Sequence, residues 1–283
     1  MGYLGANQTG AGLFGEFISV HRRSLIRGLT ILAASAGVVF ASAPASSSFI
    51  GVSSHPRIGS RVPDGSSSNL GWAASNWSGY AVTSSSNGAY TAVTGSWTIT
   101  PVARSNRQTF SSSWIGIDGF NNSNLIQTGT EADYYNGAAH YYSWWEILPA
   151  AETVIPSLVV HPGDKMSADI HRLSSGQWSI TLTDVSTKAS YTTTQNYGGQ
   201  LTSAEWIQEA PSVGGRIATL ANYGSPLTID PGTVNGGSPG LVPADGGVMV
   251  QHGAQVSTPS NPDADADGFN VSYGSHAPSP PGS

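Results

Sequence analysis

The chain has 283 residues, a formal net charge of −6 at neutral pH and no cysteine. The lack of cysteine excludes disulfides, thiol catalysis and cysteine-ligated metals. The acidic balance argues against nucleic acids and membranes as partners, because binding to nucleic acid or to an anionic membrane surface requires clustered positive charge. A chain of this length can bury a core without disulfides, and we expect that core after Gly71, where all eight tryptophans lie.

Residues 1–45 are expected to be a secretory leader. The basic stretch 21–27 precedes an apolar run, Gly28–Phe40, and the small residues Ala41–Ala45 follow it. This order is typical of a signal peptide with a cleavage site of the A-x-A kind, and the apolar run is too short to span a membrane. The arginine pair at its start also resembles a twin-arginine signal, so Sec and twin-arginine export both stay open. We therefore expect a secreted protein, and a twin-arginine leader would suggest a bacterial source.

The rest of the chain divides into three parts by composition. Residues 46–71 are rich in Ser, Pro and Gly and are expected to be a linker or a short pro-segment. Residues 72–274 carry the large apolar side chains and are expected to form the folded domain. Residues 275–283 are expected to be a disordered tail.

The domain reads as short alternating runs separated by turn residues. Ser, Thr, Val, Ile, Tyr and Trp fill the runs, and Gly, Asn, Asp and Pro separate them. The expected strands are Tyr90–Ile99, Ser113–Asp118, Ala139–Leu148, Lys165–Leu173, Trp178–Asp184, Lys188–Thr194 and Phe269–Tyr273. The Gly/Pro-rich stretch Thr228–Gly247 is expected to be a long loop. Because no run of about twelve residues shows helical periodicity, we predict an all-β fold, a β-sandwich of two large antiparallel sheets of the concanavalin/lectin-like kind.

The common nucleophile and metal systems lack their sequence patterns. There is no Gly-x-Ser-x-Gly motif, and His55 falls in the expected linker. The domain histidines show no metal-pair spacing and are expected to be structural or exposed; they are His140, His161, His171 and His252. Asp263–Gly268 has the alternating carboxylates of a calcium loop, but it lacks the later glutamate and the flanking helices of an EF-hand. We expect a solvated acidic loop there, and neither a metal nor a cofactor in the protein.

Four carboxylates among aromatic residues remain as candidates for chemistry: Asp118, Glu131, Glu146 and Glu205. A carboxylate beside bulky apolar groups is partly desolvated, which tunes it for proton transfer. The residues alone equally allow each of them to be a hydrogen-bonded acid in a sandwich interior.

A series of ordered motifs resembles those of the glutamic peptidases, the eqolisin family. They are Asn76–Gly79, Tyr90–Trp97, Trp114–Gly119, Leu125–Gly129, Tyr141–Pro149 and Ala204–Glu209. Each motif is weak alone, but their order and distances together make a specific match over roughly residues 72–273. The resemblance implies a secreted, monomeric acid endopeptidase that acts on protein or peptide substrates and has a Gln/Glu pair on the concave face of the sandwich.

By this resemblance Gln127 and Glu205 are the catalytic pair. At acid pH a histidine would be protonated, so a general base must be a carboxylate. Glu205 would deprotonate the attacking water and return the proton to the leaving amine. The amide of Gln127 does not titrate, and it would hold the water and donate to the oxyanion. Glu209 is the alternative base, because residues four apart on a regular strand point to the same face; the motif match favours Glu205.

The resemblance also implies a supporting shell. Trp77, Trp114 and Trp144 would line the substrate groove, although sandwich-core packing would explain them equally well. Asp118 and Glu146 would support the pair. Two positions depart from the family pattern: Glu131 and Tyr142 stand where fungal members have aspartates.

Two other functions stay open from the residues alone. A glycoside hydrolase would use two of the glutamates Glu131, Glu146, Glu205 and Glu209, and a retaining enzyme would hold their carboxyl groups about 5–5.5 Å apart. A non-catalytic carbohydrate-binding module would present its tryptophans as a flat exposed platform, and the fold alone does not exclude it. The ordered motifs favour the peptidase over both.

Overall fold

The computed structural model describes residues 53–59, 69–224 and 226–283. The expected leader, residues 1–45, lies outside this part of the chain. Within the described residues no helix has the length and apolar character needed to cross a membrane.

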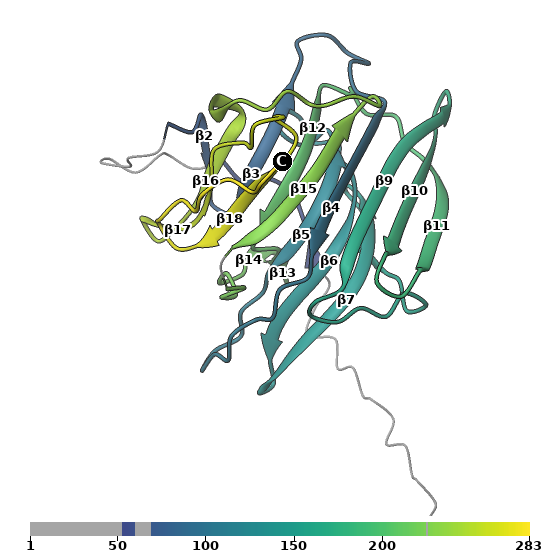
Figure 1. Ribbon diagram of the computed structural model, residues 1–283. Helices are drawn as coiled ribbons and strands as arrows, with labels where there is room; N and C mark the ends of the chain where they lie inside the picture. The colour runs from purple at the N-terminus through teal and green to yellow at the C-terminus, as the bar shows by residue number, and fades with distance from the viewer. Residues whose placement is uncertain (1–52, 60–68, 225) are drawn as a thin grey trace, which may run out of the picture. The chain divides into compact units, whose positions relative to one another are not determined.

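The described chain is almost entirely β-structure (Figure 1). Its strands are β1 (Ser53–Ser54), β2 (Trp72–Ala74), β3 (Trp77–Thr83), β4 (Ala92–Thr98), β5 (Ser112–Ile117), β6 (Ile126–Tyr135), β7 (Ala138–Ile147), β8 (Thr153–Val154), β9 (Lys165–Ser174), β10 (Gln177–Asp184), β11 (Ala189–Asn196), β12 (Ser203–Glu209), β13 (Ser212–Val213), β14 (Arg216–Ile217), β15 (Leu227–Val234), β16 (Gly246–Gln251), β17 (Ala254–Pro259) and β18 (Phe269–Tyr273). A single 3₁₀ turn, η1 (Pro243–Asp245), is the one helical element among the described residues.

Nearly all strands belong to one antiparallel path that folds back on itself. The order is β11-β10-β9-β4-β15-β18-β17-β16-β3-β12-β5-β6-β7-β8, with β2 added in parallel to β16. A small separate sheet has the order β1-β13-β14. In Figure 1 β4 and β15 lie across β5 and β12, so the two ends of the path form two packed layers. The predicted all-β fold of large antiparallel sheets is confirmed.

Two tryptophans tie the layers together. Trp206 on β12 donates its Nε1–H to the carbonyl of Thr94 on β4 over 2.7 Å, and Trp97 on β4 donates to Thr130 Oγ1 on β6 over 2.9 Å. Both indoles are buried in the main core. The layers therefore share hydrogen-bonded aromatic contacts as well as apolar burial, which satisfies the indole N–H groups inside the core.

Strand alternation separates the core from a second face. On β12 and β5 the side chains of Trp206 and Ile115 enter the main core, whereas their neighbours Ile207 and Trp114 join a separate aromatic cluster on the other face. Because successive side chains of a strand point to opposite faces, the same strands build both surfaces. This second face carries the candidate site.

The expected strands agree with the observed ones to within two residues at each end, but one expected loop is wrong. Thr228–Gly247 contains most of β15 and the start of β16. The turn residues that suggested a loop lie at an irregularity within β15. The register of β15 against β4 shifts between Ile229 and Gly232, so Asp230 and Pro231 are outside the regular pairing. A bulge of this kind accommodates a proline that could not donate to a regular ladder.

The structure places residues of both segments that were expected to flank the domain. Part of the expected linker, residues 53–59, is packed against the domain and forms β1. The expected tail has no regular secondary structure, and the carbonyl of Ser279 accepts a hydrogen bond from Asn270 Nδ2.

Replacing Gly95 with alanine should destabilise the fold by about 1–3 kcal/mol through overpacking. A Cβ at Gly95 would lie 2.6 Å from Ile115 Cγ2 and 2.9 Å from Trp206 Cδ1, at the contact between the layers. Urea unfolding followed by tryptophan fluorescence measures the change. Gly198→Ala is the control, because its Cβ would meet nothing within 4 Å, and an equal loss in both variants would contradict the packing argument.

Candidate active site

Five neighbouring strands present three rows of side chains on the second face. The register of β3, β12, β5, β6 and β7 aligns residues directly opposite one another, and such residues share a face. The first row is Ala81, Glu205, Gly116, Gln127 and Glu146; the middle row is Gly79, Ile207, Trp114, Gly129 and Trp144; the third row is Trp77, Glu209, Ser112, Glu131 and Tyr142. The predicted site residues, except Asp118 at the end of β5, thus lie on one surface, which is called the groove face below.

Three tryptophans form the floor of the groove face. Trp77, Trp114 and Trp144 are fully buried and belong to the second aromatic cluster. Trp77 meets Trp114 edge to face, with ring centroids 4.7 Å apart and an interplanar angle of 75°. Trp114 and Trp144 belong to the middle row and Trp77 to the third row.

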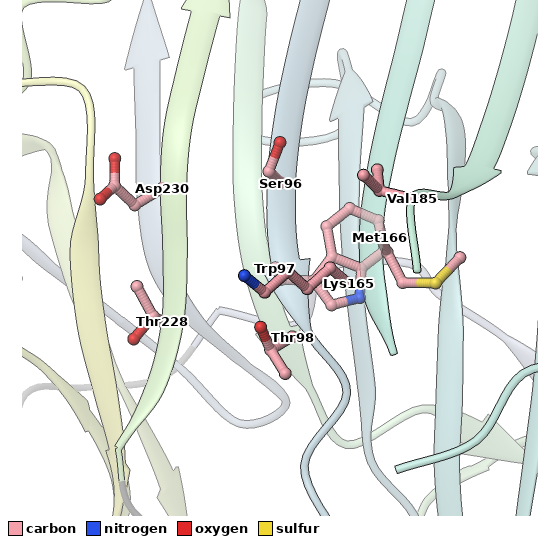
Figure 2. Close-up of a pocket in the computed structure, with 8 residues that line it drawn as sticks. All are labelled: Ser96, Trp97, Thr98, Lys165, Met166, Val185, Thr228 and Asp230. Carbon is pink, nitrogen blue, oxygen red and sulfur yellow. The ribbon is translucent and has the colours of Figure 1, made fainter. Parts of the chain in front are cut away.

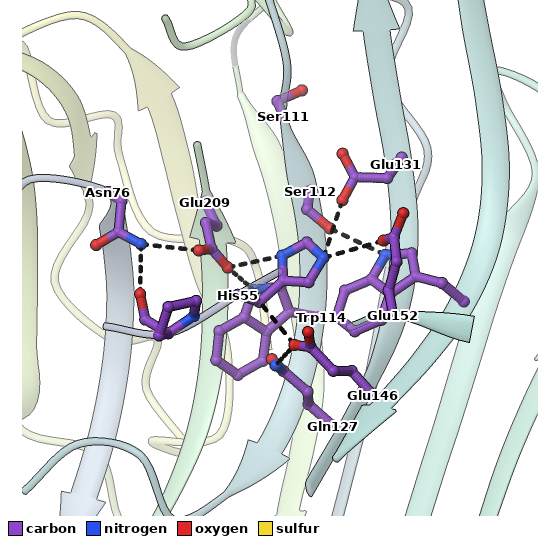
Figure 3. Close-up of polar contacts among 12 residues, drawn as sticks. His55, Asn76, Ser111, Ser112, Trp114, Gln127, Glu131, Glu146, Glu152 and Glu209 are labelled. Atoms are coloured by element: carbon purple, nitrogen blue, oxygen red, sulfur yellow. Dashed lines mark hydrogen bonds and ion pairs between the residues drawn. The ribbon is translucent and has the colours of Figure 1, made fainter. Parts of the chain in front are cut away.

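Gln127 and Glu146 are directly bonded on the groove face. Gln127 Nε2 donates to Glu146 Oε2 over 2.5 Å (Figure 3). Burial raises the pKa of Glu146 to about 7, although the charge of His55 partly lowers it. Glu146 is therefore protonated in acid solution. Gln127 Oε1 and Glu146 Oε1 are buried without a hydrogen-bond partner in the described part of the chain, so both atoms are available to a bound molecule.

Glu209 is surrounded by hydrogen-bond donors. Trp114 Nε1 donates to its Oε2 over 2.7 Å, and Asn76 Nδ2 donates to its Oε1 over 2.8 Å. Burial raises the pKa of Glu209, and His55 and Trp114 oppose part of that rise. Donors to both oxygens stabilise the ionised carboxylate. Asn76 was quoted in a family motif but was not predicted to touch the site.

Glu205 lies on the same face but has fewer hydrogen-bond donors around its carboxylate. It is fully buried, and neither carboxylate oxygen accepts a well-formed hydrogen bond from the described residues. Burial raises its pKa well above the usual value; Ser203 and Arg57 lower it only in part, and the charge of Asp118 raises it further. Glu205 and Glu209 therefore share a face, as a regular strand requires, but differ in the groups that could hold a charge.

Asp118 forms hydrogen bonds with the segment that leads into β12. It directly follows the last residue of β5, has a positive φ of 72° and is fully buried. Its carboxylate accepts hydrogen bonds from Tyr197 Oη, the backbone N–H groups of Leu201 and Thr202, and Asn122 Nδ2 at 2.7 to 3.0 Å. These contacts hold the segment that enters β12. Asp118 is thus a positioning residue for the strand that carries both glutamates.

Glu131 lies in a group of buried acids at the end of the groove face. Asp133 follows two residues later on the same strand, and Glu152 lies near both. Burial raises the pKa of Glu131 well above its usual value and that of Asp133 to about 8. Tyr142, which replaces a family aspartate, donates its O–H to Glu152 Oε1 over 2.9 Å. Glu131 and Tyr142, the two positions that differ from the family pattern, therefore both lie beside the same acids, with Tyr142 hydrogen-bonded to Glu152.

His55 is the site residue that the sequence analysis missed. Its ring is fully buried and stacks on Trp144 with centroids 4.0 Å apart and planes 2° from parallel. Nδ1 lies 3.1 Å from Glu209 Oε2, Nε2 lies 3.1 Å from Glu152 Oε2, and the backbone N–H donates to Glu146 Oε2 over 3.1 Å (Figure 3). No local signal could reveal this, because the partners lie 91 to 154 residues away in sequence.

The charge of His55 is set by opposing effects. Burial lowers its pKa, but Glu209, Glu152 and Glu131 raise it by more, and the net pKa is well above 6.5. His55 also places a ligand atom within 4.8 Å of those of Glu131 and Glu152, an arrangement that could hold a metal ion. The ion pairs that the imidazole makes with the same carboxylates account for this grouping.

The rest of the segment 53–59 crosses the groove as an extended peptide. Ser53 and Ser54 pair with β13, and Asn76 is bonded to the segment twice, to the backbone N–H of Ile58 and the carbonyl of Pro56, at 2.9 and 2.8 Å. The Arg57 guanidinium lies over the Phe120 ring, 4.2 Å from its centroid. Backbone pairing and side-chain pockets are the usual means of holding an extended peptide on a sheet.

Comparison with known proteins agrees with this geometry. A family model described as the Peptidase A4 family matches residues 75–273. The chain belongs to this family. Aspergillopepsin-2 of Aspergillus niger is 27% identical over 224 residues, which cover 70% of this chain and 77% of that protein. The predicted membership in the glutamic peptidases is confirmed.

Solved structures support the fold of this Peptidase A4 member. Scytalido-glutamic peptidase with a transition state analog inhibitor matches with a TM-score of 0.59 and 20% identity, covering 70% of this chain and 98% of that one. Aspergilloglutamic peptidase from Aspergillus niger matches with a TM-score of 0.51 and 27% identity, covering 58% and 99%. Both are consistent with the β-sandwich described above.

The buried acids predict that the protein is more stable in acid than near neutrality. Asp133 has a pKa of about 8 in the fold, against about 3.9 when unfolded. The folded state therefore binds the extra proton between those values, and stability falls as pH rises through about 4 to 8. Thermal unfolding in the Gln127→Ala background, which limits self-digestion, should show a higher midpoint near pH 4 than near pH 8.

Asp133→Asn should flatten this pH dependence, since the amide does not titrate. An unfolding midpoint that rises from pH 4 to 8 in the background protein would contradict the assignment of raised pKa values.

Proposed function

We propose that this Peptidase A4 member is a secreted acid endopeptidase that cleaves peptide bonds by direct attack of water. The observation that carries the proposal is the segment 53–59, an extended peptide that lies across Gln127, Glu146 and Glu209 and meets Glu146 and Glu209 directly. A groove that binds its own chain in extended form is suited to a peptide substrate. The leader pattern supports export, by Sec or by the twin-arginine route.

Gln127 and a glutamate of β12 form the proposed catalytic pair, and the contacts favour Glu209 over Glu205 as the base. Glu209 has donors on both carboxylate oxygens, which favour the ionised form. Glu205 is buried without such donors, and burial raises its pKa well above the usual value, which disfavours the ionised form that a base needs. The motif match favours Glu205, which stays the alternative.

The proposed reaction needs no metal or covalent intermediate. Glu209 takes a proton from water as the water oxygen attacks the carbonyl carbon of the scissile bond. Gln127 Nε2 has two hydrogens: one is donated to Glu146, and the other can stabilise the oxyanion of the tetrahedral intermediate. Collapse breaks the C–N bond, and the proton passes from Glu209 to the leaving amine. Glu146, protonated below about pH 7, holds the amide in place.

Two earlier alternatives receive less support from the geometry. A retaining glycoside hydrolase needs two facing carboxyl groups. Glu205 faces Gln127, not an acid, across Gly116. Glu209 and Glu131 do share a row across Ser112, but the imidazole of His55 contacts both of them. A carbohydrate-binding module needs exposed flat aromatics, whereas Trp77, Trp114 and Trp144 are fully buried.

We further propose that the segment around His55 is a short pro-segment rather than a linker. Its imidazole occupies the space between Glu209 and Glu152, and its backbone N–H uses Glu146 Oε2. A substrate cannot reach Glu209 while His55 is bound there. Removal of this segment would open the groove.

The catalytic pair is tested by three variants in a protein-digestion assay between about pH 2 and 7. Gln127→Ala should lower kcat by about 100- to 1,000-fold, the usual cost of one oxyanion donor. Glu209→Gln should abolish activity, whereas Glu205→Gln should keep most of it. Circular dichroism controls for folding.

Inactivity of folded Glu205→Gln with activity retained in Glu209→Gln would return the base to Glu205. Near wild-type activity in Gln127→Ala would show that the pair is wrong altogether.

The pro-segment is tested with a synthetic peptide of residues 53–59 added to the processed enzyme. Competitive inhibition is expected, and His55→Ala in the peptide should weaken it by about 10-fold or more, because charged hydrogen bonds to Glu209 and Glu152 are lost. Ile58→Ala is the matched control, since Ile58 is 41% exposed. Equal inhibition by the His55→Ala and wild-type peptides would contradict the role of the imidazole.

A further inference from the structure

An acidic group outside the groove face combines two distant parts of the chain. Asp263 and Asp267 lie in the turn between β17 and β18, and Asp230 lies on β15. A carboxylate oxygen from each lies within 4.8 Å of the others. The turn has the Asp-x-Asp-x-Asp-Gly spacing noted in the sequence. Asp230 supplies a carboxylate from another strand, which the sequence pattern alone lacked.

Asp263 is oriented into this group with one oxygen unused. Its Oδ1 accepts hydrogen bonds from the backbone N–H groups of Asp267 and Gly268 at 3.1 and 3.2 Å. Its Oδ2 is buried and has no hydrogen-bond partner in the described chain, and the residue is only 9% exposed. A buried carboxylate oxygen without a donor is costly, and such an atom requires an explanation.

Gly268 allows the carboxylates to converge. A Cβ at this position would lie 2.5 Å from Asp263 Oδ2 and 2.6 Å from Asp230 Oδ1. Any larger residue would therefore displace the two oxygens. The glycine leaves both of them facing the same small space.

No basic side chain in the described part of the chain neutralises the group. Among the described residues, none of the three aspartates forms an ion pair with a lysine or arginine. Lys165 and Asp230 both line a hollow of about 280 Å³ (Figure 2), without an ion pair between them. The group thus has an uncompensated negative charge.

We propose that Asp230, Asp263 and Asp267 bind a calcium ion. Calcium takes six to eight oxygen ligands in flexible geometry, and carboxylates on loops are its usual protein ligands. Asp230 takes the place of the distant glutamate that completes an EF-hand loop. Asp230 and Asp267 are partly exposed, so water can complete the coordination. Magnesium fits less well, because it demands a stricter octahedral geometry.

The ion would stabilise the layer behind the groove. The backbone N–H of Gly232 donates to the carbonyl of Asp267 over 2.8 Å, and a Cβ at Gly232 would lie 2.6 Å from Trp206 Nε1. Trp206 lies on β12, beside the strand positions of the catalytic candidates. Calcium would hold the turn against β15 and so support the packing of Trp206. This inference does not depend on the proposed peptidase mechanism.

The test is calcium titration of the full chain near pH 7 after treatment with EDTA. Calorimetry should show one site with a Kd of about 0.1–1 mM, the range of extracellular calcium modules. Saturating calcium should raise the thermal unfolding midpoint by several degrees, since a ligand that binds only the folded state stabilises it. Magnesium at the same concentration should give a smaller shift.

Asp263→Asn and Asp230→Asn should each weaken calcium binding by about 10-fold or more. The asparagine at 263 keeps an Oδ1 acceptor for Asp267 and Gly268, so the turn should still form. Asp169→Asn, a carboxylate on β9 outside the group, is the control and should bind as the wild type does. Asp230→Asn remains decisive if Asp263→Asn fails to fold.

Two results would overturn the proposal. One is a folded wild-type chain with neither binding heat nor a shifted midpoint at about 10 mM calcium, well above the expected Kd. The other is calcium binding of wild-type strength in the folded Asp230→Asn variant.

Discussion

The antiparallel register of β12, β5, β6 and β7 determines where the side chains of the groove face lie. Opposite residues share a face, so Glu205 and Gln127 lie in one row and Glu209 and Glu131 in another. The residues that alternate with these rows along each strand, such as Trp206 and Ile115, point the other way into the main core. A shift of one residue in this register would exchange the two sets. The site and the core are therefore two consequences of one pairing pattern.

The same pairing places acids in apolar surroundings. Tryptophans cover the floor, and the carboxyl groups above them lose water, which raises the pKa values of Glu131, Glu146 and Glu205. Hydrogen-bond donors favour the ionised form of an acid. Both oxygens of Glu209 accept such bonds, whereas neither oxygen of Glu205 has a well-formed one from the described residues. This difference in local donors, rather than position on the strand, separates two glutamates that share a face.

His55 connects the groove to the N-terminal part of the chain. Its partners come from β12, from β7 and from the segment that follows β7. A cation among several acids lowers the cost of burying them, and stacking on Trp144 excludes water from the contact. The acids and the histidine thus stabilise one another, which accounts for the close fit of a segment with little apolar side chain of its own.

The sequence by itself determined the family, the all-β fold and most strands. Alternation and turn residues are local properties of the chain, and the order of the family motifs can be read directly from the sequence. It also led to the prediction of Gln127 and Glu205 as the catalytic pair, with Glu209 as the alternative base. Only the tertiary structure decided the surroundings of those glutamates, the burial of His55, the strand at Leu227–Val234 and the approach of Asp230 to the turn at Asp263. Each of these depends on contacts between residues far apart in the chain, and a local pattern has no information about which distant groups will supply a donor, a charge or a partner strand.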